Sequence, residues 1–302
     1  MKLTQNDMPA SVFRAIETMD YSGRDVERFA SITELITPPY ALHLKESCED
    51  SITLDAQELI AAFVGNAVHQ MLALSNKKRI SALVEERLAI EIDGLVISGC
   101  PDLYEAGMIT DYKCTKCSSF NGKARDEWEF QLNCYALLCR HAGYRVLGLQ
   151  IDCIFLDWSK VKTSNANYPS APCVAIPFVM WRDDDIIAEL RKRIARLKAA
   201  RAGELFDCSA AERWDRPSIY VIMHKDRKTA VNARITDLVE ANAEQDRLNR
   251  EHKTGHYIQL RPGERVRCEH YCNVRSICPS FARHCAEKAN PKNQEDTGND
   301  QD

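Results

Sequence analysis

The chain has 302 residues, of which 45% are hydrophobic and 28% are charged. This composition is typical of a globular protein with a sizeable core, and the length suits one large domain or two ordinary ones. No apolar run is long enough to span a membrane, and residues 1–7 lack the apolar stretch of a signal peptide. These features argue against a membrane protein, and we expect a cytoplasmic location.

The formal net charge is −4, and the chain contains 13 cysteines. The net charge does not point to a nucleic-acid partner, but acidic surface elsewhere can hide a local basic groove in the sum. Disulfide frameworks are rare in the cytoplasm, so the cysteines are better interpreted as reduced core thiols and metal ligands.

Residues 1–53 are expected to form an N-terminal helical segment. Within it, Ser31 and Glu34 have the spacing of a capping box, which predicts a short helix that ends at Pro38-Pro39. Residues 54–74 are predicted to form a longer helix with Asp55 as its N-cap. Its apolar positions recur at helical spacing, namely Leu59, Ile60, Phe63, Val64, Ala67, Val68, Met71 and Leu72.

Residues 84–114 are predicted to form a meander of three antiparallel strands. Alternating apolar residues mark the first strand, and Asp93-Gly94 is a strong signal for a two-residue hairpin turn. The next two strands would be joined by a tight turn at residues 105–107. Asp102 lies on the earlier of these strands, and Asp111 and Lys113 lie on the later one.

The meander brings two carboxylates and one ammonium group together. Asp111 and Lys113 are two residues apart on a strand and therefore share a face, and the turn folds Asp102 towards them. Carboxylate oxygens hold Mg²⁺ or Mn²⁺, and a lysine can position water or offset developing charge. The alternative is that Asp102 is a turn residue and that Asp111 with Lys113 is an ordinary surface pair.

Further elements follow in the second half of the chain. A helix is predicted over residues 126–141, in which Gln131 and Tyr135 are four apart and share one face. Strands are predicted at 147–158 and 173–180, followed by a helix at 183–202. The basic later part of this helix is either a solvated face or a surface that contacts phosphate. Another helix is expected near 229–250, and the polar tail 286–302 is expected to be disordered.

Three cysteines stand close together near the C-terminus: Cys268, Cys272 and Cys278. Thiolates suit iron–sulfur clusters and zinc alike, so the ligand type does not choose between them. His270 could join a zinc site. Cys114 and Cys117 form a second short motif, which we interpret as two ordinary thiols because no further pair faces them.

Taken together, the motifs resemble those of the PD-(D/E)xK nuclease superfamily, specifically its RecB-like branch, which includes phage-type exonucleases and CRISPR-associated iron–sulfur nucleases. The resemblance covers roughly residues 31–157, together with the C-terminal cysteines. No single motif is specific, but four in the same order are difficult to reach by chance. The matching segments are Gly65-x-x-x-His69, Gly99-Cys100-Pro101-Asp102, Asp111-Tyr112-Lys113 and Gln131-x-x-x-Tyr135.

The resemblance implies a fold and a set of roles. The expected fold is an α/β (α+β) restriction-endonuclease-like core, in which helices flank a mixed central sheet, with a C-terminal cysteine-bearing extension. Asp102 and Asp111 would bind Mg²⁺ or Mn²⁺ with His69 and the Tyr112 backbone carbonyl. Lys113 would orient or deprotonate the attacking water, which makes His69, Asp102, Asp111 and Lys113 the expected catalytic group. Gln131 and Tyr135 would contact the DNA strand.

In the cluster-bearing relatives, three cysteines follow the nuclease core and a fourth precedes it. The resemblance therefore implies a [4Fe-4S] cluster on Cys268, Cys272 and Cys278, with zinc or no metal at all as the alternatives. This chain departs from the pattern at the fourth ligand, because its early segment reads Thr37-Pro38-Pro39-Tyr40. Cys285 is the expected fourth ligand, with Cys48 as the alternative.

The leading hypothesis is a metal-dependent deoxyribonuclease of the phage or prophage recombination type, most simply an exonuclease. One alternative is a DNA-binding or assembly factor that keeps the fold without catalysis, and another is a structural metalloprotein. Expected partners are DNA and a single-strand annealing protein or another recombination partner; an oligomer is compatible with these residues. The expected division is an N-terminal segment to 53, a nuclease core at 54–204, a helical cysteine-bearing region at 205–285 and the tail.

Overall fold

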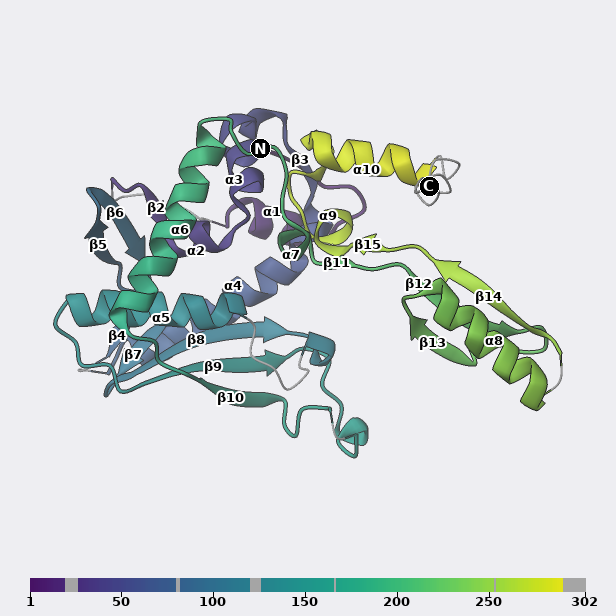
Figure 1. Cartoon of the computed structure of the whole chain (residues 1–302). Coiled ribbons are helices and arrows are strands. Elements are labelled where there is room, and N and C mark those ends of the chain that lie inside the picture. Colours follow the sequence, from purple (N-terminus) through teal and green to yellow (C-terminus); the bar gives the residue numbers. More distant parts are fainter. Residues whose placement is uncertain (20–26, 80–81, 120–125, 166, 253, 290–302) are drawn as a thin grey trace. The chain divides into compact units, whose positions relative to one another are not determined.

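The computed structural model describes residues 1–19, 27–79, 82–119, 126–165, 167–252 and 254–289 (Figure 1). The chain divides into two compact units, Met1–Leu205 and Phe206–Asp302, which are described separately. Most of the expected tail, from residue 290 onwards, lies outside the described residues. No helix in these ranges combines the length and the apolar character that a membrane crossing requires.

A five-stranded mixed sheet is the centre of the first unit. Its strand order is β10-β9-β8-β7-β4, and β8 and β9 are parallel while the other neighbours are antiparallel. The strands are β4 (Leu83–Val84), β7 (Leu103–Glu105), β8 (Met108–Thr115), β9 (Gly148–Phe155) and β10 (Cys173–Phe178). The mixed α/β architecture expected from the sequence is therefore confirmed.

A second sheet of the first unit has the order β2-β6-β5, formed by β2 (Ala30–Ser31), β6 (Leu95–Gly99) and β5 (Leu88–Ile92). The predicted three-stranded meander is therefore wrong: β5 pairs with β6, but β6 and β7 belong to different sheets. Residues 100–102 carry the chain from one sheet to the other, and Asp102 precedes β7 instead of lying within a strand. Local alternation of apolar residues predicts strands but does not say which strands pair.

Both predicted hairpin turns are present. Asp93 and Gly94 have φ angles of 49° and 77°, and Ala106 and Gly107 have φ angles of 49° and 88°. Two consecutive residues in the left-handed region are typical of the type I′ turn, whose twist matches that of the flanking strands. The second turn sets the register of β7 against β8 and thereby the position of Asp102 relative to Asp111.

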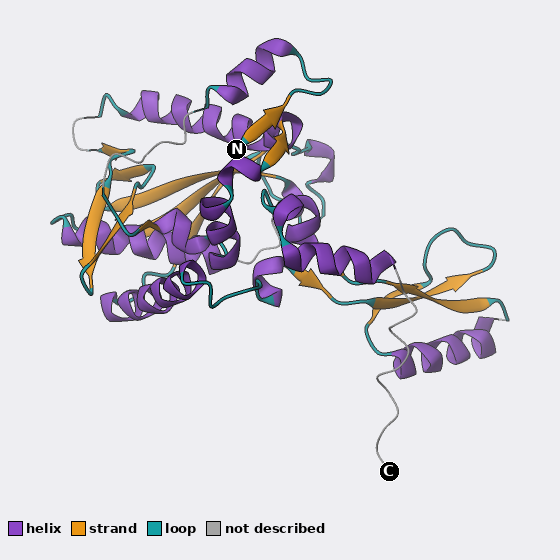
Figure 2. Cartoon of the chain, turned by 90° about the horizontal axis from the view of Figure 1, so that it is seen from above, coloured by secondary structure: helices purple, strands orange, loops and turns teal. Residues whose placement is uncertain are grey.

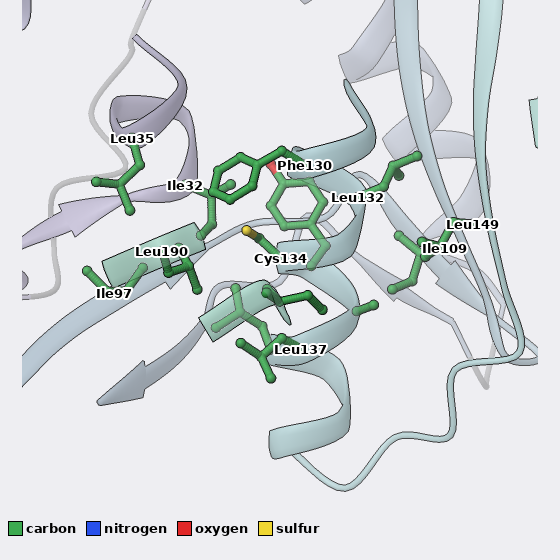
Figure 3. Packing of buried hydrophobic residues seen from close by; sticks show 14 of the residues in the cluster. Ile32, Leu35, Ile97, Ile109, Phe130, Leu132, Cys134, Leu137, Leu149 and Leu190 are labelled. Atoms are coloured by element: carbon green, nitrogen blue, oxygen red, sulfur yellow. The ribbon is translucent and has the colours of Figure 1, made fainter. Parts of the chain in front are cut away.

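Helix α5 (Asp126–His141) lies between the two sheets and begins and ends where the sequence predicted. All of its residues from 130 to 139 are buried, so nearly the whole circumference of the helix faces protein. Figure 3 shows Phe130, Leu132, Cys134 and Leu137 of α5 among apolar residues of the neighbouring elements. These neighbours are Ile32, Leu35, Ile97 and Leu190 together with Ile109 and Leu149 of the five-stranded sheet.

Helix α6 (Asp183–Arg201) packs its apolar side against α5 and α2 (Ile32–Ile36), where the predicted Ser31–Glu34 capping box is present. Several of its basic residues form ion pairs within the unit. Arg191 donates to Asp93, Arg193 pairs with Glu189, and Arg201 pairs with Glu46 on α3 (Pro39–Ser47). These pairs favour a structural role over a phosphate-contacting one for the three arginines.

Helix α4 (Ile60–Asn76) begins later than predicted, because β3 (Thr53–Asp55) and a short 3₁₀ turn (Ala56–Leu59) come before it. Asp55 caps that 3₁₀ turn by accepting from the Gln57 amide. The apolar side of α4 is largely exposed within this unit: Ala73 is the only buried residue of α4, and Met71 and Leu74 are 69% and 61% exposed. Before α4, β1 (Lys2–Thr4) pairs with β3, and α1 (Ala10–Glu17) packs on the 3₁₀ turn.

The second unit was expected to be helical but also contains strands. A three-stranded sheet of order β13-β12-β14 carries α8 (Leu238–His252) on one face, where Ile222, Ile235, Ala241 and Leu248 form a small core (Figure 2). Its strands are β12 (Ile219–His224), β13 (Asn232–Ile235) and β14 (His256–Arg261). We call residues 217–263 the three-stranded module.

The chain enters and leaves this module through two short paired strands, β11 (Asp215–Arg216) and β15 (Glu264–Arg265). Three helices stand beside that pair in the sequence: α7 (Ala210–Arg213) before β11, and α9 (Val266–His270) and α10 (Pro279–Ala289) after β15. All four cysteines of this unit that precede α10 lie in these flanking segments: Cys208, Cys268, Cys272 and Cys278.

The close packing of α5 on β6 requires a glycine at position 99. A Cβ atom at this position would lie 2.7 Å from Leu138 Cδ1 and 2.9 Å from Tyr135 Cε1. We expect Gly99→Ala to lower the free energy of unfolding by about 1–3 kcal/mol, because the core must shift to admit the methyl group. Denaturant unfolding measures the change.

Gly65 on α4 is the matched control, since a Cβ there meets no atom within 4 Å. Gly65→Ala should raise the free energy of unfolding by about 0.5–1 kcal/mol through helix propensity alone. Equal effects of the two substitutions would contradict the packing described for Gly99.

Candidate active site

The candidate active site is a group of polar residues around the start of β8 and the helices on either side, which we call the acidic site: His69, Asp102, Asp111, Tyr112, Lys113, Gln131 and Tyr135. Strand geometry separates its members. Asp111 and Lys113 share one face of β8, which is the face that contacts α5, while the Tyr112 side chain points the opposite way. The residues predicted for the nuclease site come from α4, from α5, from β8 and from the position directly before β7.

Asp111 and Lys113 form the ion pair at the centre of the acidic site. The Lys113 ammonium contacts Asp111 Oδ2, and the Asp111 side chain is only 2% exposed. Burial raises the pKa of Asp111 to about 6; Lys113 opposes this rise, and Asp102 adds to it. A carboxylate kept in this environment is costly, because desolvation disfavours its charged form. Such a cost is typical of functional sites.

Asp102 is held by the backbone of β8. Its Oδ2 accepts a hydrogen bond of 2.7 Å from the Tyr112 amide, and its Oδ1 lies 3.4 Å from His69 Nδ1. The other ring nitrogen, His69 Nε2, lies 2.9 Å from the Tyr112 carbonyl oxygen. Both contacts of the ring are acceptors, and the hydrogen bond to Asp102 raises the pKa of His69. The imidazolium form, with a proton on each nitrogen, suits this position.

Gln131 and Tyr135 are brought together with Lys113 but are buried, with 6% and 4% of their surface exposed. Lys113 Nζ donates to Gln131 Oε1 over 3.2 Å, and Gln131 Nε2 donates to the Tyr135 hydroxyl over 2.9 Å. Burial raises the pKa of Tyr135 well above its ordinary value, so the hydroxyl stays neutral. These two hydrogen bonds orient the Lys113 side chain. The expected contact of Gln131 and Tyr135 with DNA stays a prediction.

Two carboxylates and a backbone carbonyl are hard oxygen donors of the kind that Mg²⁺ and Mn²⁺ prefer. Asp111 Oδ2 is buried and accepts no well-formed hydrogen bond within the described ranges; its contact is the ionic one with Lys113. The residues present therefore fit a divalent cation. The Tyr112 carbonyl is engaged by His69, so a cation would exchange this contact for its own.

A different trio gathers three possible ligand atoms within 4.8 Å of one another: Glu264, Glu269 and His270 in the second unit. Among the residues that the structure describes, this is the only such trio. His270 lies 3.0 Å from Glu264, and Glu269 pairs with His284 and Lys288. These ion pairs already account for the trio, so it needs no metal to be explained.

One residue of the acidic site escaped the sequence analysis. Asn76 stands seven positions after His69 on α4, hence on the same side of the helix, and donates to the Tyr112 hydroxyl over 3.3 Å. It holds the side chain of the residue whose amide and carbonyl bind Asp102 and His69. The helical spacing from His69 was the available signal, although an asparagine near a helix end is too common to single out.

The buried carboxyl of Asp111 predicts an unusual dependence of stability on pH. Its pKa is about 6 in the folded chain and near the ordinary 3.8 in the unfolded chain. As the pH rises from about 4 to about 6, the unfolded chain releases this proton more readily, and the folded state loses stability. Without metal, Asp111→Asn should therefore raise the free energy of unfolding at about pH 7 and change it little at about pH 4.

Thermal unfolding in a chelator checks this expectation at both pH values. Added Mg²⁺ should then raise the unfolding temperature of the native chain but not that of the variant, because a bound ligand stabilises the folded state. A variant that is less stable than the native chain at neutral pH without metal would show that Asp111 is a structural ion-pair residue.

The sequence matches no protein-family model and no curated protein. Solved structures are similar to the chain at low identity. The protein SSO0001 matches with 16% identity and a TM-score of 0.44, covering 62% of this chain and 84% of that one. An alkaline exonuclease from Laribacter hongkongensis matches with 15% identity and a TM-score of 0.35, covering 58% and 88%.

A phage-related exonuclease from Haemophilus somnus 129PT matches with 18% identity and a TM-score of 0.29, covering 46% of this chain and 69% of that one. At these identities and TM-scores we draw nothing about activity from the likeness.

Proposed function

We propose that this chain is a metal-dependent nuclease that hydrolyses phosphodiester bonds of DNA, and specifically an exonuclease of the phage recombination type. The observation that carries the proposal is the buried Asp111 carboxyl in contact with the Lys113 ammonium and close to Asp102. Carboxylates with a purely structural role seldom occupy a buried position that disfavours their charged form, whereas carboxylates that bind a cation regularly do.

In the proposed mechanism Asp102, Asp111 and the Tyr112 carbonyl would hold the divalent cation, and His69 would join them as a ligand after its imidazolium gives up a proton. When bound, the cation neutralises charge on the phosphate and lowers the pKa of water. Lys113, held by Gln131 through a 3.2 Å hydrogen bond, orients the attacking water and offsets charge that develops on the phosphate. Asp102 also keeps β8 in register through the Tyr112 amide.

Gln131 and Tyr135 act as positioning residues in this mechanism, because they reach the reaction only through Lys113. Their burial among the apolar residues of α5 leaves them few alternative orientations. Lys113 is consequently confined by two contacts, the carboxylate of Asp111 and the amide oxygen of Gln131. A confined ammonium loses little freedom when the phosphate arrives.

The proposal extends to the thiol group of the second unit. Cys268, Cys272 and Cys278, with one further thiol as the fourth ligand, would hold a [4Fe-4S] cluster or zinc. Proposed partners are DNA and a single-strand annealing protein or other recombination factor. DNA cleavage and metal content are measured independently, so the nuclease activity and the thiol-bound metal centre are tested separately.

The first test is digestion of end-labelled linear DNA and closed circular DNA with Mg²⁺ or Mn²⁺. We expect loss of the linear substrate only, with Asp111→Ala and Lys113→Met each lowering the rate by at least about 100-fold, as for removal of one group that stabilises a transition state. Lys116→Met is the matched control, since Lys116 is exposed directly after β8 and should keep full activity.

Two outcomes would contradict the proposal. Unchanged cleavage in Asp111→Ala would place the activity elsewhere or in a contaminant. No cleavage of either substrate, combined with binding of DNA by the native chain, would favour the DNA-binding or assembly factor over the enzyme. Cleavage of circular DNA would retain the nuclease but replace the exonuclease by an endonuclease.

A further inference from the structure

Four cysteines of the second unit lie on segments that pack together. Cys208 directly precedes Ser209, the N-cap of α7, and Cys268 lies on α9. Cys272 follows α9, and Cys278 directly precedes α10. Only the last three form a short sequence motif, because the whole three-stranded module separates Cys208 from them.

Specific contacts fasten the segment of Cys208 to the segments of the other three. Asp207 Oδ1 accepts a hydrogen bond of 2.7 Å from Ser280, two residues after Cys278. Helix α7 packs against α9, and Arg267 on α9 donates to the Glu212 carbonyl of α7 over 3.2 Å. Cys208 therefore lies between two segments that contact the elements of the other thiols. Asp207 before it contacts Ser280 of α10, and α7 after it contacts α9.

The thiols are close enough to influence one another. Burial raises the pKa of Cys208 to about 12, with further contributions from Glu212 and from Cys268, Cys272 and Cys278. Burial likewise raises the pKa of Cys268 to about 11, with Cys272 and Cys278 adding to it. This mutual influence agrees with the contacts of Asp207 and α7, which bring the segment of Cys208 to the segments of the other three thiols.

Arginines surround the group. Arg213 and Arg265 oppose the rise in the pKa of Cys268, and Arg267 and Arg275 oppose that of Cys272. Arg213 also donates to the carbonyl oxygen of Cys208. A metal centre bound by four thiolates carries net negative charge, and a surrounding layer of guanidinium groups stabilises it.

We propose that Cys208, Cys268, Cys272 and Cys278 together ligate one iron–sulfur cluster, with Cys208 as the fourth ligand. Each thiol gives up its proton on ligation. The fourth ligand then follows the nuclease core of this chain, in the same unit as the other three. This inference rests on the thiol-bound centre of the proposed function, to which it adds the fourth ligand, and it does not depend on the nuclease activity.

The geometry favours a cluster over a single zinc ion. Tetrahedral zinc with Zn–S bonds of about 2.3 Å brings all four sulfurs within about 4 Å of one another. The described part of the chain contains no trio of cysteine sulfurs within 4.8 Å, since the one trio that meets this limit is Glu264, Glu269 and His270. The cysteines are grouped, but more widely than one ion requires, as suits a centre made of several metal atoms.

Cys285 is the weaker candidate for the fourth ligand. It lies on α10 and is exposed. Cys48, the other ligand considered from the sequence, is the C-cap of α3 in the first unit. Cys208 alone combines burial with contacts to the segments of the three C-terminal cysteines.

The test compares the full-length native chain with Cys208→Ser and with Cys285→Ser as the matched control, all purified without oxygen. Iron, acid-labile sulfide and zinc are quantified, and the visible absorption of a cluster is recorded. We expect iron and sulfide in the native chain and in Cys285→Ser, and at least a several-fold loss of both in Cys208→Ser. Retention by Cys208→Ser with loss in Cys285→Ser would overturn the assignment.

Stoichiometric zinc without iron in the native chain would also overturn the proposal, as would failure of the anaerobic native chain to take up iron and sulfide. None of these outcomes bears on DNA cleavage, so failure here is distinguishable from failure of the nuclease assignment.

A measurement on the native chain avoids any folding defect of the variants. Alkylation of the thiols, mapped by mass spectrometry, is compared before and after the iron is removed by chelation. Cys208, Cys268, Cys272 and Cys278 should react only after removal, whereas the exposed Cys285 should react in both states. Alkylation of Cys208 while the iron remains bound would refute its role as a ligand.

Discussion

The burial of helix α5 between two sheets is the constraint on which the first unit depends. Its ten residues from 130 to 139 are all buried, and they contact both sheets as well as α2 and α6. A helix in that position can carry polar side chains only where they find partners, because an unpaired buried amide or hydroxyl is costly. Gln131 and Tyr135 find theirs in each other and in Lys113.

That constraint connects the fold to the chemistry. The central helix holds Gln131, Gln131 holds Lys113, and Lys113 neutralises Asp111 on the same strand face. On the other side of β8, His69 and Asp102 bind the carbonyl and the amide of Tyr112. The strand therefore contributes the side chains of Asp111 and Lys113 and the backbone amide and carbonyl of Tyr112 to the acidic site.

Patterns within single elements were predictable from the sequence. The bounds of α5, the two type I′ turns and the shared face of Asp111 and Lys113 follow from local periodicity and from glycine placement, which depend only on near neighbours. The assignment of β6 and β7 to different sheets was missed because strand pairing is decided by contacts distant in the sequence. The exposure of Met71 was not predictable, because periodicity predicts an apolar face but not the partner that covers it.

The same limit applies to the candidate sites. The order of Asp102, Asp111 and Lys113 along a hairpin was sufficient to expect their meeting, since a tight turn forces it. Cys208 could not be found in this way, because the three-stranded module separates it from Cys268 in the sequence and spacing rules reach only over short segments. The strands of the module were equally hidden, since their short apolar runs flank a longer helical pattern.

The pairing of β11 with β15 has a further consequence. Arg216 stands opposite Glu264, and a Cβ on Gly263 would lie only 2.7 Å from the Arg216 carbonyl, so the chain departs and returns at one point. The three-stranded module has its own core and makes a closed excursion from that point. A short linker could replace it without altering the neighbourhood of the four cysteines, and lineages could gain, lose or exchange it as an independent insertion.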